Sequence, residues 1–160
     1  MIGVIVTTYN RPAALARSLP AIAAATAQVG GQLLVVDDGS NLVDALENKG
    51  ITLGIKERRA DYLHLPVNRG LACALNVGLC HFLADKDISA ISVFQDDVEV
   101  DEQTLTVIED LRLFYPDALF TGHSAKEHAV TASLSLCDVG IELRAACRAT
   151  HIHAAVPVWR

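Results

Sequence analysis

The chain has 160 residues, of which 51% are hydrophobic, and its formal net charge is −6 at pH 7. This length suits one domain with a sizeable core, and the composition excludes an intrinsically disordered chain. The acidic balance disfavours a general nucleic-acid-binding role, because such a role needs a basic surface and the main basic cluster is the short run 56–59. We therefore expect no nucleic-acid partner.

The first part of the chain alternates between strand-like and helix-like stretches. A buried strand is predicted over 2–6, and a helix over 13–27 follows, since Pro12 suits a first helical turn and Gly30-Gly31 end the pattern. The next predicted elements are a strand over 32–36, a short helix over 41–48, a weaker strand over 62–65, a helix over 70–84, a strand over 88–94 and a helix over 101–115.

Such alternation is typical of an α/β fold in which helices cover both faces of a mostly parallel sheet. Beyond residue 118 the pattern is less regular. Strand-like runs occupy 119–121, 131–136 and 151–159, and the segment 138–148 suits either a helix or a mixed structure. No linker or repeat divides the chain, so residues 1–160 are predicted to form a single domain.

The four cysteines form no Cys-x-x-Cys pair, and a reducing cytosol is the simplest compartment for them. Residues 18–36 carry no charge, which raises the question of a membrane span. Pro20 and Gly30-Gly31 interrupt this stretch, so a helix, a turn and a strand explain it better. We expect a cytoplasmic location and no transmembrane segment in this chain.

Polar residues follow three of the predicted strands at the point where each strand ends. These runs are Thr7 to Asn10, Asp37 to Ser40 and Gln95 to Asp97. The carboxyl ends of parallel strands lie at one edge of a sheet, where open α/β folds bind their ligands. Asp96 and Asp97 repel each other unless a cation or hydrogen-bond donors neutralise them. This pair therefore predicts a divalent metal with a phosphate on its far side.

The other runs indicate a nucleotide, although a simpler reading stays open for each. Tyr9 could stack on a nucleobase, and Asp38 could accept hydrogen bonds from a ribose, but Asp38-Gly39 is also a plain turn signal. Arg69 stands where a helix begins and could help to hold an anion, or it could be a solvated side chain. The first turn lacks Gly-x-Gly-x-x-Gly and the chain lacks a P-loop motif, which argues against NAD, FAD and P-loop nucleotide sites.

Four motifs together resemble a known family. They are VIVTTYNRP at 4–12, VVDDGS at 35–40, NRGLACALNVG at 68–78 and FQDD at 94–97. In this order and spacing they resemble the family 2 glycosyltransferases of GT-A fold over about residues 1–115. The resemblance implies a three-layer α/β/α fold, with 1–115 as the donor-binding part and 116–160 as the start of an acceptor-side part that is cut short.

The resemblance also implies roles for individual residues. Tyr9 would lie against the nucleobase, Asp38 would bind the base edge or the ribose, and Asp97 would be the favoured direct ligand of Mg²⁺ or Mn²⁺. Asp96 would be a second metal ligand or a contact to the ribose or sugar. The implied nucleotide-sugar site comprises Thr7, Tyr9, Asn10, Asp37, Asp38, Asn68, Arg69, Gly70 and Asp96.

The implied reaction is metal-dependent, inverting transfer of a sugar from a nucleotide-diphosphate sugar to an acceptor hydroxyl. UDP is the favoured nucleotide. The acceptor could be a glycan, a lipid or a protein, and a role in cell-envelope polysaccharide synthesis at the inner membrane face is compatible with the family. The metal would neutralise the charge that develops on the leaving diphosphate.

The reaction also needs a general base, which the family supplies from its later half. Glu127 is the best candidate in this chain, although its surroundings are not distinctive. A non-catalytic nucleotide-sugar-binding module or a catalytically incomplete fragment therefore stays open as an alternative. A nucleotidyltransferase is disfavoured because the first loop is not Gly-rich and basic, and a structural protein with a fossil site is a further alternative.

Overall fold

The computed structural model of the chain describes residues 1–56, 60–114 and 153–157. Its elements follow in the order β1 (Ile2–Thr8), α1 (Pro12–Gln28), β2 (Gln32–Asp37), α2 (Leu42–Leu53), β3 (Ala60–His64), α3 (Leu71–Leu83), β4 (Ala90–Gln95), α4 (Thr104–Phe114) and β5 (His153–Pro157). The predicted segments 119–121, 131–136 and 138–148 and the candidate base Glu127 lie outside these residues.

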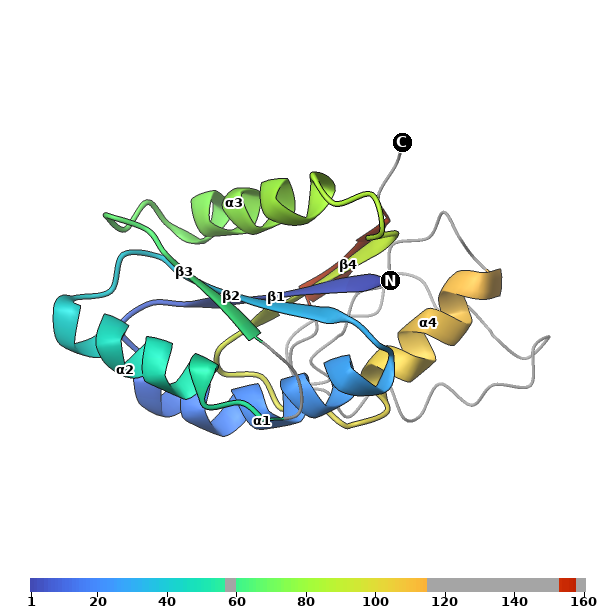
Figure 1. Cartoon of the computed structure of the whole chain (residues 1–160), viewed down its shortest axis with the longest axis horizontal. Helices are drawn as coiled ribbons and strands as arrows, with labels where there is room; N and C mark the ends of the chain where they lie inside the picture. Colours follow the sequence, from blue (N-terminus) through green and yellow to red (C-terminus); the bar gives the residue numbers. More distant parts are fainter. Residues whose placement is uncertain (57–59, 115–152, 158–160) are drawn as a thin grey trace, which may run out of the picture.

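The described strands form one sheet in the order β3-β2-β1-β4-β5. The pairs β1–β2, β1–β4 and β2–β3 are parallel, and β5 runs antiparallel to β4. Helix α3 covers one face of the sheet, and α1, α2 and α4 lie on the other (Figure 1). The predicted three-layer α/β/α fold with a mostly parallel sheet is therefore confirmed.

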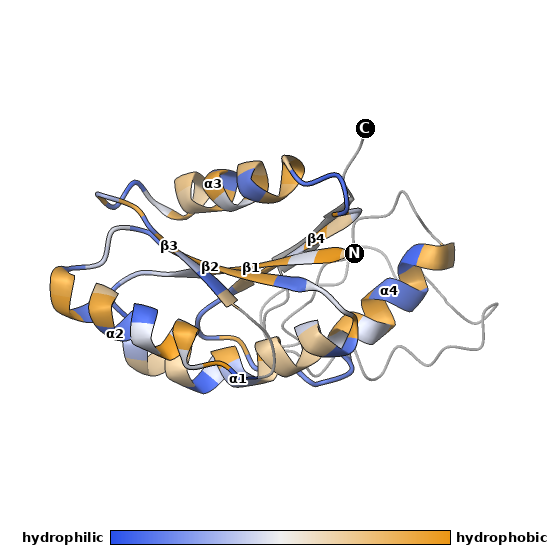
Figure 2. Ribbon diagram, viewed as in Figure 1, coloured by the Kyte–Doolittle hydropathy of each residue, from blue (hydrophilic) through white to orange (hydrophobic). Residues whose placement is uncertain are grey.

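Strand β1 lies at the centre of this arrangement, and all seven of its residues are buried. It is covered on both faces, which explains why it reads as a continuous apolar run rather than an alternating one. Figure 2 shows the hydrophobic colouring along β1 between the helical layers. One apolar cluster packs β1 against α1 and α4, and a second cluster packs the opposite face of the sheet against α3.

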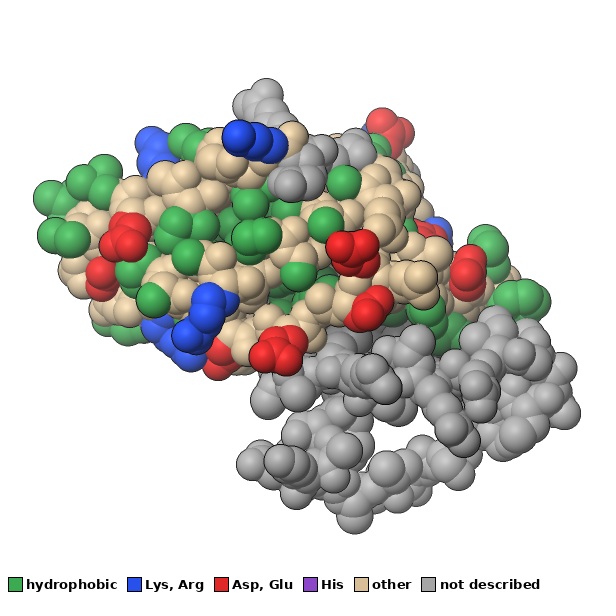
Figure 3. Space-filling model, turned by 90° about the horizontal axis from the view of Figure 1, so that it is seen from below, with side chains coloured by type: hydrophobic (Ala, Val, Ile, Leu, Met, Phe, Trp, Pro, Cys, Tyr) green, Lys and Arg blue, Asp and Glu red, His purple; other side chains and the backbone are tan. Residues whose placement is uncertain are grey.

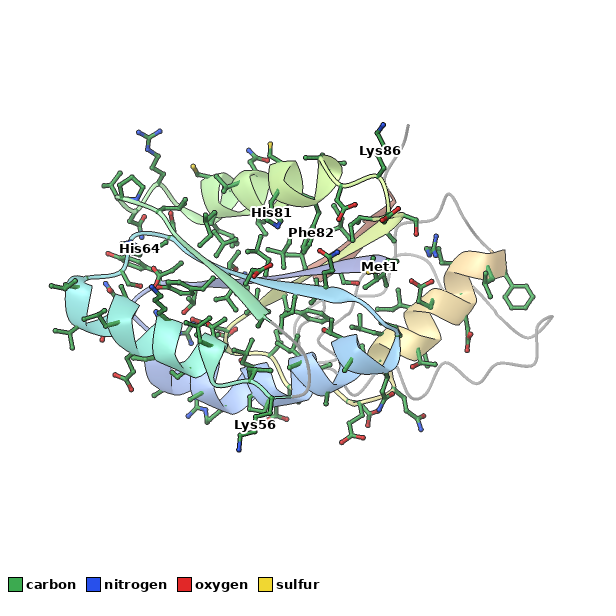
Figure 4. The ribbon with its side chains drawn as sticks, viewed as in Figure 1. Met1, Lys56, His64, His81, Phe82 and Lys86 are labelled. Carbon is green, nitrogen blue, oxygen red and sulfur yellow. The ribbon has the colours of Figure 1, made fainter. Side chains whose placement is uncertain are left out.

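Helix α3 approaches the sheet closely because both surfaces carry a glycine. Phe82 points from α3 toward β1 (Figure 4), where a Cβ on Gly3 would lie 2.7 Å from its ring. A Cβ on Gly78 would lie 2.9 Å from Ile5. Real Cβ atoms do not approach that closely, so either side chain would force the layers apart.

Helix α2 extends beyond its predicted end for a local reason, and α1 matches its predicted bounds to within one residue at each end. Helix α2 does not stop before Gly50 but continues to Leu53, since Thr52 is fully buried and donates a 2.8 Å hydrogen bond to the carbonyl of Asn48. Asn41 caps its start by accepting from the N–H groups of residues 43 and 44. Helix α1 continues through Pro20, which is exposed. Because proline has no N–H, the carbonyl four residues earlier loses its helical hydrogen bond, and water can supply it.

The outer surface of α2 carries exposed hydrophobic residues. Leu42, Val43 and Leu46 are 75%, 72% and 63% exposed. Hydrophobic side chains gather at the left of Figure 3, in the region of this helix. Within the described parts of the chain, no helix is both long and apolar enough to cross a membrane.

Candidate functional site

A cavity of about 280 Å³ opens at the carboxyl ends of the central strands. It lies where the chain order reverses, because the strands after β1 are added first on the β2 side and then on the β4 side. Such a switch point is the usual ligand site of an open α/β sheet. The cavity is lined by Thr7, Thr8, Tyr9, Arg11, Asp38, Asn68, Gly70, Leu71, Ala74, Gln95 and Asp96.

The end of β1 supplies the first wall. Pairing with β2 continues to Thr8, so Thr7 and Thr8 belong to the strand and are buried rather than lying in a loop. Tyr9 follows them and is 43% exposed at the cavity. Asn10 adopts a positive φ of 52°, and its N–H donates to Ser40 Oγ at 2.8 Å. Asn10 therefore connects the loops after β1 and β2.

The two aspartates at the end of β2 have different surroundings. Asp37 is fully buried, and its carboxylate accepts hydrogen bonds from Ser40 N, Asn48 Nδ2 and Tyr62 Oη at 2.8, 2.8 and 2.7 Å. Burial would raise the pKa of Asp37, but these hydrogen bonds outweigh it and lower that pKa. Burial and the neighbouring Asp37 together raise the pKa of Tyr62. The described lining of the cavity includes Asp38 but not Asp37.

The loop after β2 supplies the second wall of the cavity. In this loop, Asp38 contacts the loop before α3. Its Oδ1 accepts from the backbone N–H of Arg69 at 3.1 Å. Gly39 has a φ of +76°, and a Cβ there would lie 2.3 Å from the backbone nitrogen of Asn68. Only glycine allows this approach. The loops after β2 and β3 are consequently held in direct contact beside the cavity.

The start of α3 supplies the third wall. Asn68 Oδ1 accepts from the N–H of Gly70 at 3.1 Å, and Gly70 takes a φ of +86° as the helix N-cap. Both residues line the cavity, whereas the side chain of Arg69 is exposed beside it. Nearby, a ring nitrogen of His64 lies 3.2 Å from the carbonyl of Ser40 (Figure 4).

The acidic pair after β4 shares one arginine. Arg11 Nη1 lies 3.2 Å from Asp96 Oδ1, and Arg11 Nη2 lies 3.1 Å from Asp97 Oδ2. Asp96 is 3% exposed, and its Oδ2 accepts from Thr8 Oγ1 at 2.7 Å. Burial raises the pKa of Asp96, and Thr8 and Arg11 oppose this shift without reversing it.

Asp97 lies on the other side of the acidic pair. It lines a neighbouring cavity of about 470 Å³ together with Ala14, Arg17, Ser18, Ala21, Asp96, Val98, Glu99 and Val100. Asp96 borders both cavities. The carboxylates of Asp96 and Asp97 are hard oxygen donors that suit Mg²⁺ or Mn²⁺. The described part of the chain brings no third His, Cys, Asp or Glu to them.

The structure thus brings most of the predicted residues together. Thr7, Tyr9, Asp38, Asn68, Gly70 and Asp96 line one cavity. Asn10, Asp37 and Arg69 are not among its described lining residues; Asn10 and Asp37 hold the loops, and the backbone N–H of Arg69 donates to Asp38. The sequence interpretation missed Arg11, which stands three residues beyond the end of β1. The available signal was the acidic pair itself, because it called for a cation and Arg11 is the cation that the structure supplies.

Residues 3–122 match the family model described as Glycosyl transferase family 2. The chain belongs to glycosyltransferase family 2. The match covers all three walls of the cavity, so the family resemblance of the four motifs is confirmed. The comparison with curated proteins gives no match for this glycosyltransferase.

Solved structures share the fold of this family 2 chain. S. aureus TarS 1–349 in complex with UDP-GlcNAc matches with a TM-score of 0.59 and 18% identity over 82% of the chain. The mannosyltransferase PcManGT from Pyrobaculum calidifontis, in complex with GDP-Man and Mn²⁺, matches with a TM-score of 0.65 and 18% identity over 77% of it. The matches span only 37% and 35% of those two chains. They confirm the GT-A fold.

Proposed function

We propose that the cavity binds a nucleotide-diphosphate sugar and that the protein transfers the sugar to an acceptor hydroxyl with inversion, with the help of a divalent metal. The observation that carries this proposal is the position of Asp96. Its buried carboxylate lies between the cavity that Tyr9 and Asp38 line and the neighbouring cavity that Asp97 lines. An anionic diphosphate in the first cavity would be repelled by the carboxylates of Asp96 and Asp97. A divalent cation bound to both the diphosphate and the carboxylates would neutralise this repulsion.

Three walls of the cavity suit the three parts of a nucleoside diphosphate. The exposed ring of Tyr9 offers a stacking surface for a base. Asp38 offers a carboxylate, one oxygen of which already accepts from Arg69 N, to a ribose or base edge. The N-terminus of α3 at Gly70 favours an anion, because the helix dipole and free N–H groups point there.

Asp96 and Asp97 would hold Mg²⁺ or Mn²⁺, which would supply Lewis-acid stabilisation of the leaving diphosphate. Other residues of the chain hold the acidic pair in position for the donor. Thr8 holds one oxygen of Asp96 in a fixed position, and Ser18 Oγ donates to the carbonyl of Asp96 at 2.8 Å. The acidic pair is therefore positioned before any ligand binds.

The structural relatives support the class of donor. TarS was solved with UDP-GlcNAc and PcManGT with GDP-Man and Mn²⁺. Both ligands are nucleotide-diphosphate sugars, and UDP remains the nucleotide that we propose for this chain. The acceptor would be a glycan, a lipid or a protein. Glu127 is our candidate for the general base that deprotonates the acceptor.

Calorimetry tests the proposal directly. The protein is titrated with UDP, GDP and ADP, each with and without Mn²⁺. We expect at least one nucleoside diphosphate to bind, and Mn²⁺ to strengthen its binding. If no nucleotide gives a heat of binding above that of the buffer titration, with or without Mn²⁺, the proposal is wrong. Binding without any turnover of the matching nucleotide sugar would instead favour a non-catalytic binding module.

A substitution in the acidic pair tests the metal role. Asp97→Asn should weaken Mn²⁺-dependent nucleotide binding by roughly tenfold or more, equivalent to about 1.4 kcal/mol, because a neutral amide is a poorer ligand than a carboxylate. The matched control is Asp110→Asn, which removes the same charge from the exposed face of α4. Equal Kd values for the two variants would refute the role of Asp97.

A further inference from the structure

Arg11 bridges the two carboxylates that we propose as metal ligands. Its two terminal nitrogens contact the two carboxylates separately, at 3.2 Å to Asp96 Oδ1 and 3.1 Å to Asp97 Oδ2. A planar guanidinium with several N–H donors can bridge two acids in this way, whereas an ammonium group acts as a point charge. The repulsion between the adjacent carboxylates is thereby neutralised by the chain itself.

Each oxygen of the Asp96 carboxylate already has a partner within the chain. Oδ2 accepts from Thr8, which is buried and belongs to β1, so this contact is fixed by the sheet. Oδ1 is the oxygen that Arg11 contacts. An ion that binds Asp96 through Oδ1 and also reaches Asp97 would compete with the guanidinium for the same two carboxylates.

Arg11 is held in a way that allows this exchange. Its carbonyl accepts from the N–H groups of Ala14 and Leu15 at 3.0 and 3.1 Å, so its backbone is anchored as the N-cap of α1. Its side chain is 50% exposed and borders the first cavity. The side chain can move away from the carboxylates while the helix stays in place.

We propose that Arg11 is the resident counter-cation of the acidic pair, and that a divalent ion binds Asp96 and Asp97 only by displacing its guanidinium. This inference rests on the proposed function, since it concerns the same metal. It adds a consequence for donor binding. A diphosphate in the first cavity would give the displaced guanidinium a new anionic partner. Nucleotide and metal would then favour each other's binding partly through Arg11.

The experiment measures Mn²⁺ binding without nucleotide, from the loss of the EPR signal of free Mn²⁺. Arg11→Gln should bind Mn²⁺ about five- to tenfold more tightly than the unchanged protein, because no intramolecular cation competes. Arg11→Lys should fall between the two, since it keeps the charge but cannot bridge both acids. Arg17→Gln is the control, because it removes the same charge from an exposed position beside Asp97 and makes no ion pair with either acid among the described contacts.

Each result decides the question. Tighter binding by Arg11→Gln alone supports the displacement. Equal or weaker binding by Arg11→Gln, or an equal gain in Arg17→Gln, overturns it, because net charge would then explain any change. If Arg11→Gln does not fold, Arg11→Lys carries the test, and unchanged affinity in that variant counts against the inference. Failure of the proposed function gives a different pattern, in which no variant binds Mn²⁺ even with UDP or GDP present.

Discussion

The carboxylate of Asp37 accepts three hydrogen bonds and has no exposed surface, whereas Asp38 beside it lines the cavity. Consecutive residues of an extended chain point in opposite directions, which explains the difference. Asp37 binds Ser40, Asn48 and Tyr62 and so fixes the loop that carries Asp38. We infer that Asp37 acts by positioning this loop.

The surroundings of Asp37 predict how stability depends on pH. Its pKa is lowered in the folded state, so the ionised carboxylate stabilises the fold above the unfolded-state pKa of about 3.9, and this contribution is lost as pH falls through the lower folded value. Asp37→Asn should cost about 1–3 kcal/mol at pH 7, because it leaves donors poorly paired. The difference from the unchanged protein should shrink toward pH 3.

Urea unfolding at several pH values measures this effect. Asp110→Asn on the exposed face of α4 is the control, and it should change stability by less than about 0.5 kcal/mol. A difference for Asp37→Asn that does not depend on pH would contradict the argument.

At the residue scale, sequence reasoning succeeded where strand ends place polar side chains together. Tyr9, Asp38 and Asp96 come from distant parts of the chain and line one cavity. It favoured Asp38 as the binding residue but kept Asp37 in the same site, because the motif alone does not show which side chain faces the cavity. Arg11 was missed because an ion pair over 86 positions depends on the register of β1 against β4.

At the scale of the element, two helical glycines have opposite surroundings. In the described part of the chain, Gly50 in α2 has no atom beyond its chain neighbours and its own helix backbone within 4 Å of where a Cβ would stand, whereas a Cβ on Gly78 in α3 would lie 2.9 Å from Ile5. Gly50→Ala should stabilise the protein by about 0.5–1 kcal/mol, the usual gain in helix propensity. Gly78→Ala should destabilise it by about 1–3 kcal/mol through overpacking.

Denaturant midpoints of the two variants provide the measurement, and each variant serves as the control for the other. The same substitution in the same kind of element should move the midpoint in opposite directions. Stabilisation by Gly78→Ala would mean that α3 can shift away from the sheet without loss, which would contradict the close packing of Gly78 against Ile5.

The elements themselves were largely predictable, but their ends were not. Thr8 and Asp37 extend β1 and β2 because each pairs with the other across the sheet, which local sequence does not reveal. Helix α4 begins at Thr104 rather than at residue 101, since Asp101 Oδ1 accepts from Gln103 N and forms a turn first. In α2, tertiary burial of Thr52 outweighs the breaking tendency of Gly50.

At the scale of the whole molecule, the sheet has a protected centre and a less protected edge. Strand β1 pairs on both sides and is buried along its whole length, while β3 pairs with β2 alone among the described strands and is partly exposed. Amides of 2–8 should therefore exchange with deuterium at least about tenfold more slowly than those of 60–64. Hydrogen-exchange mass spectrometry measures this, and equal rates would argue against the strand order.

The overall fold followed from the strand–helix alternation and from the four motifs, because a mostly parallel sheet requires helical crossovers. The position of β5 beside β4 did not follow. It pairs antiparallel with a strand more than fifty positions earlier in the chain, and a strand-like pattern at 151–159 cannot name its neighbour.

The contact of Gly39 with the backbone of Val67 and Asn68 has a consequence for protein engineering. The loop that carries Asp38 and the loop that leads into α3 pack directly against each other. A side chain at position 39 would collide with the backbone of the other loop, so the conformation of each loop depends on the other. An attempt to change the donor nucleotide should graft residues 37–41 and 65–70 together from the same parent protein.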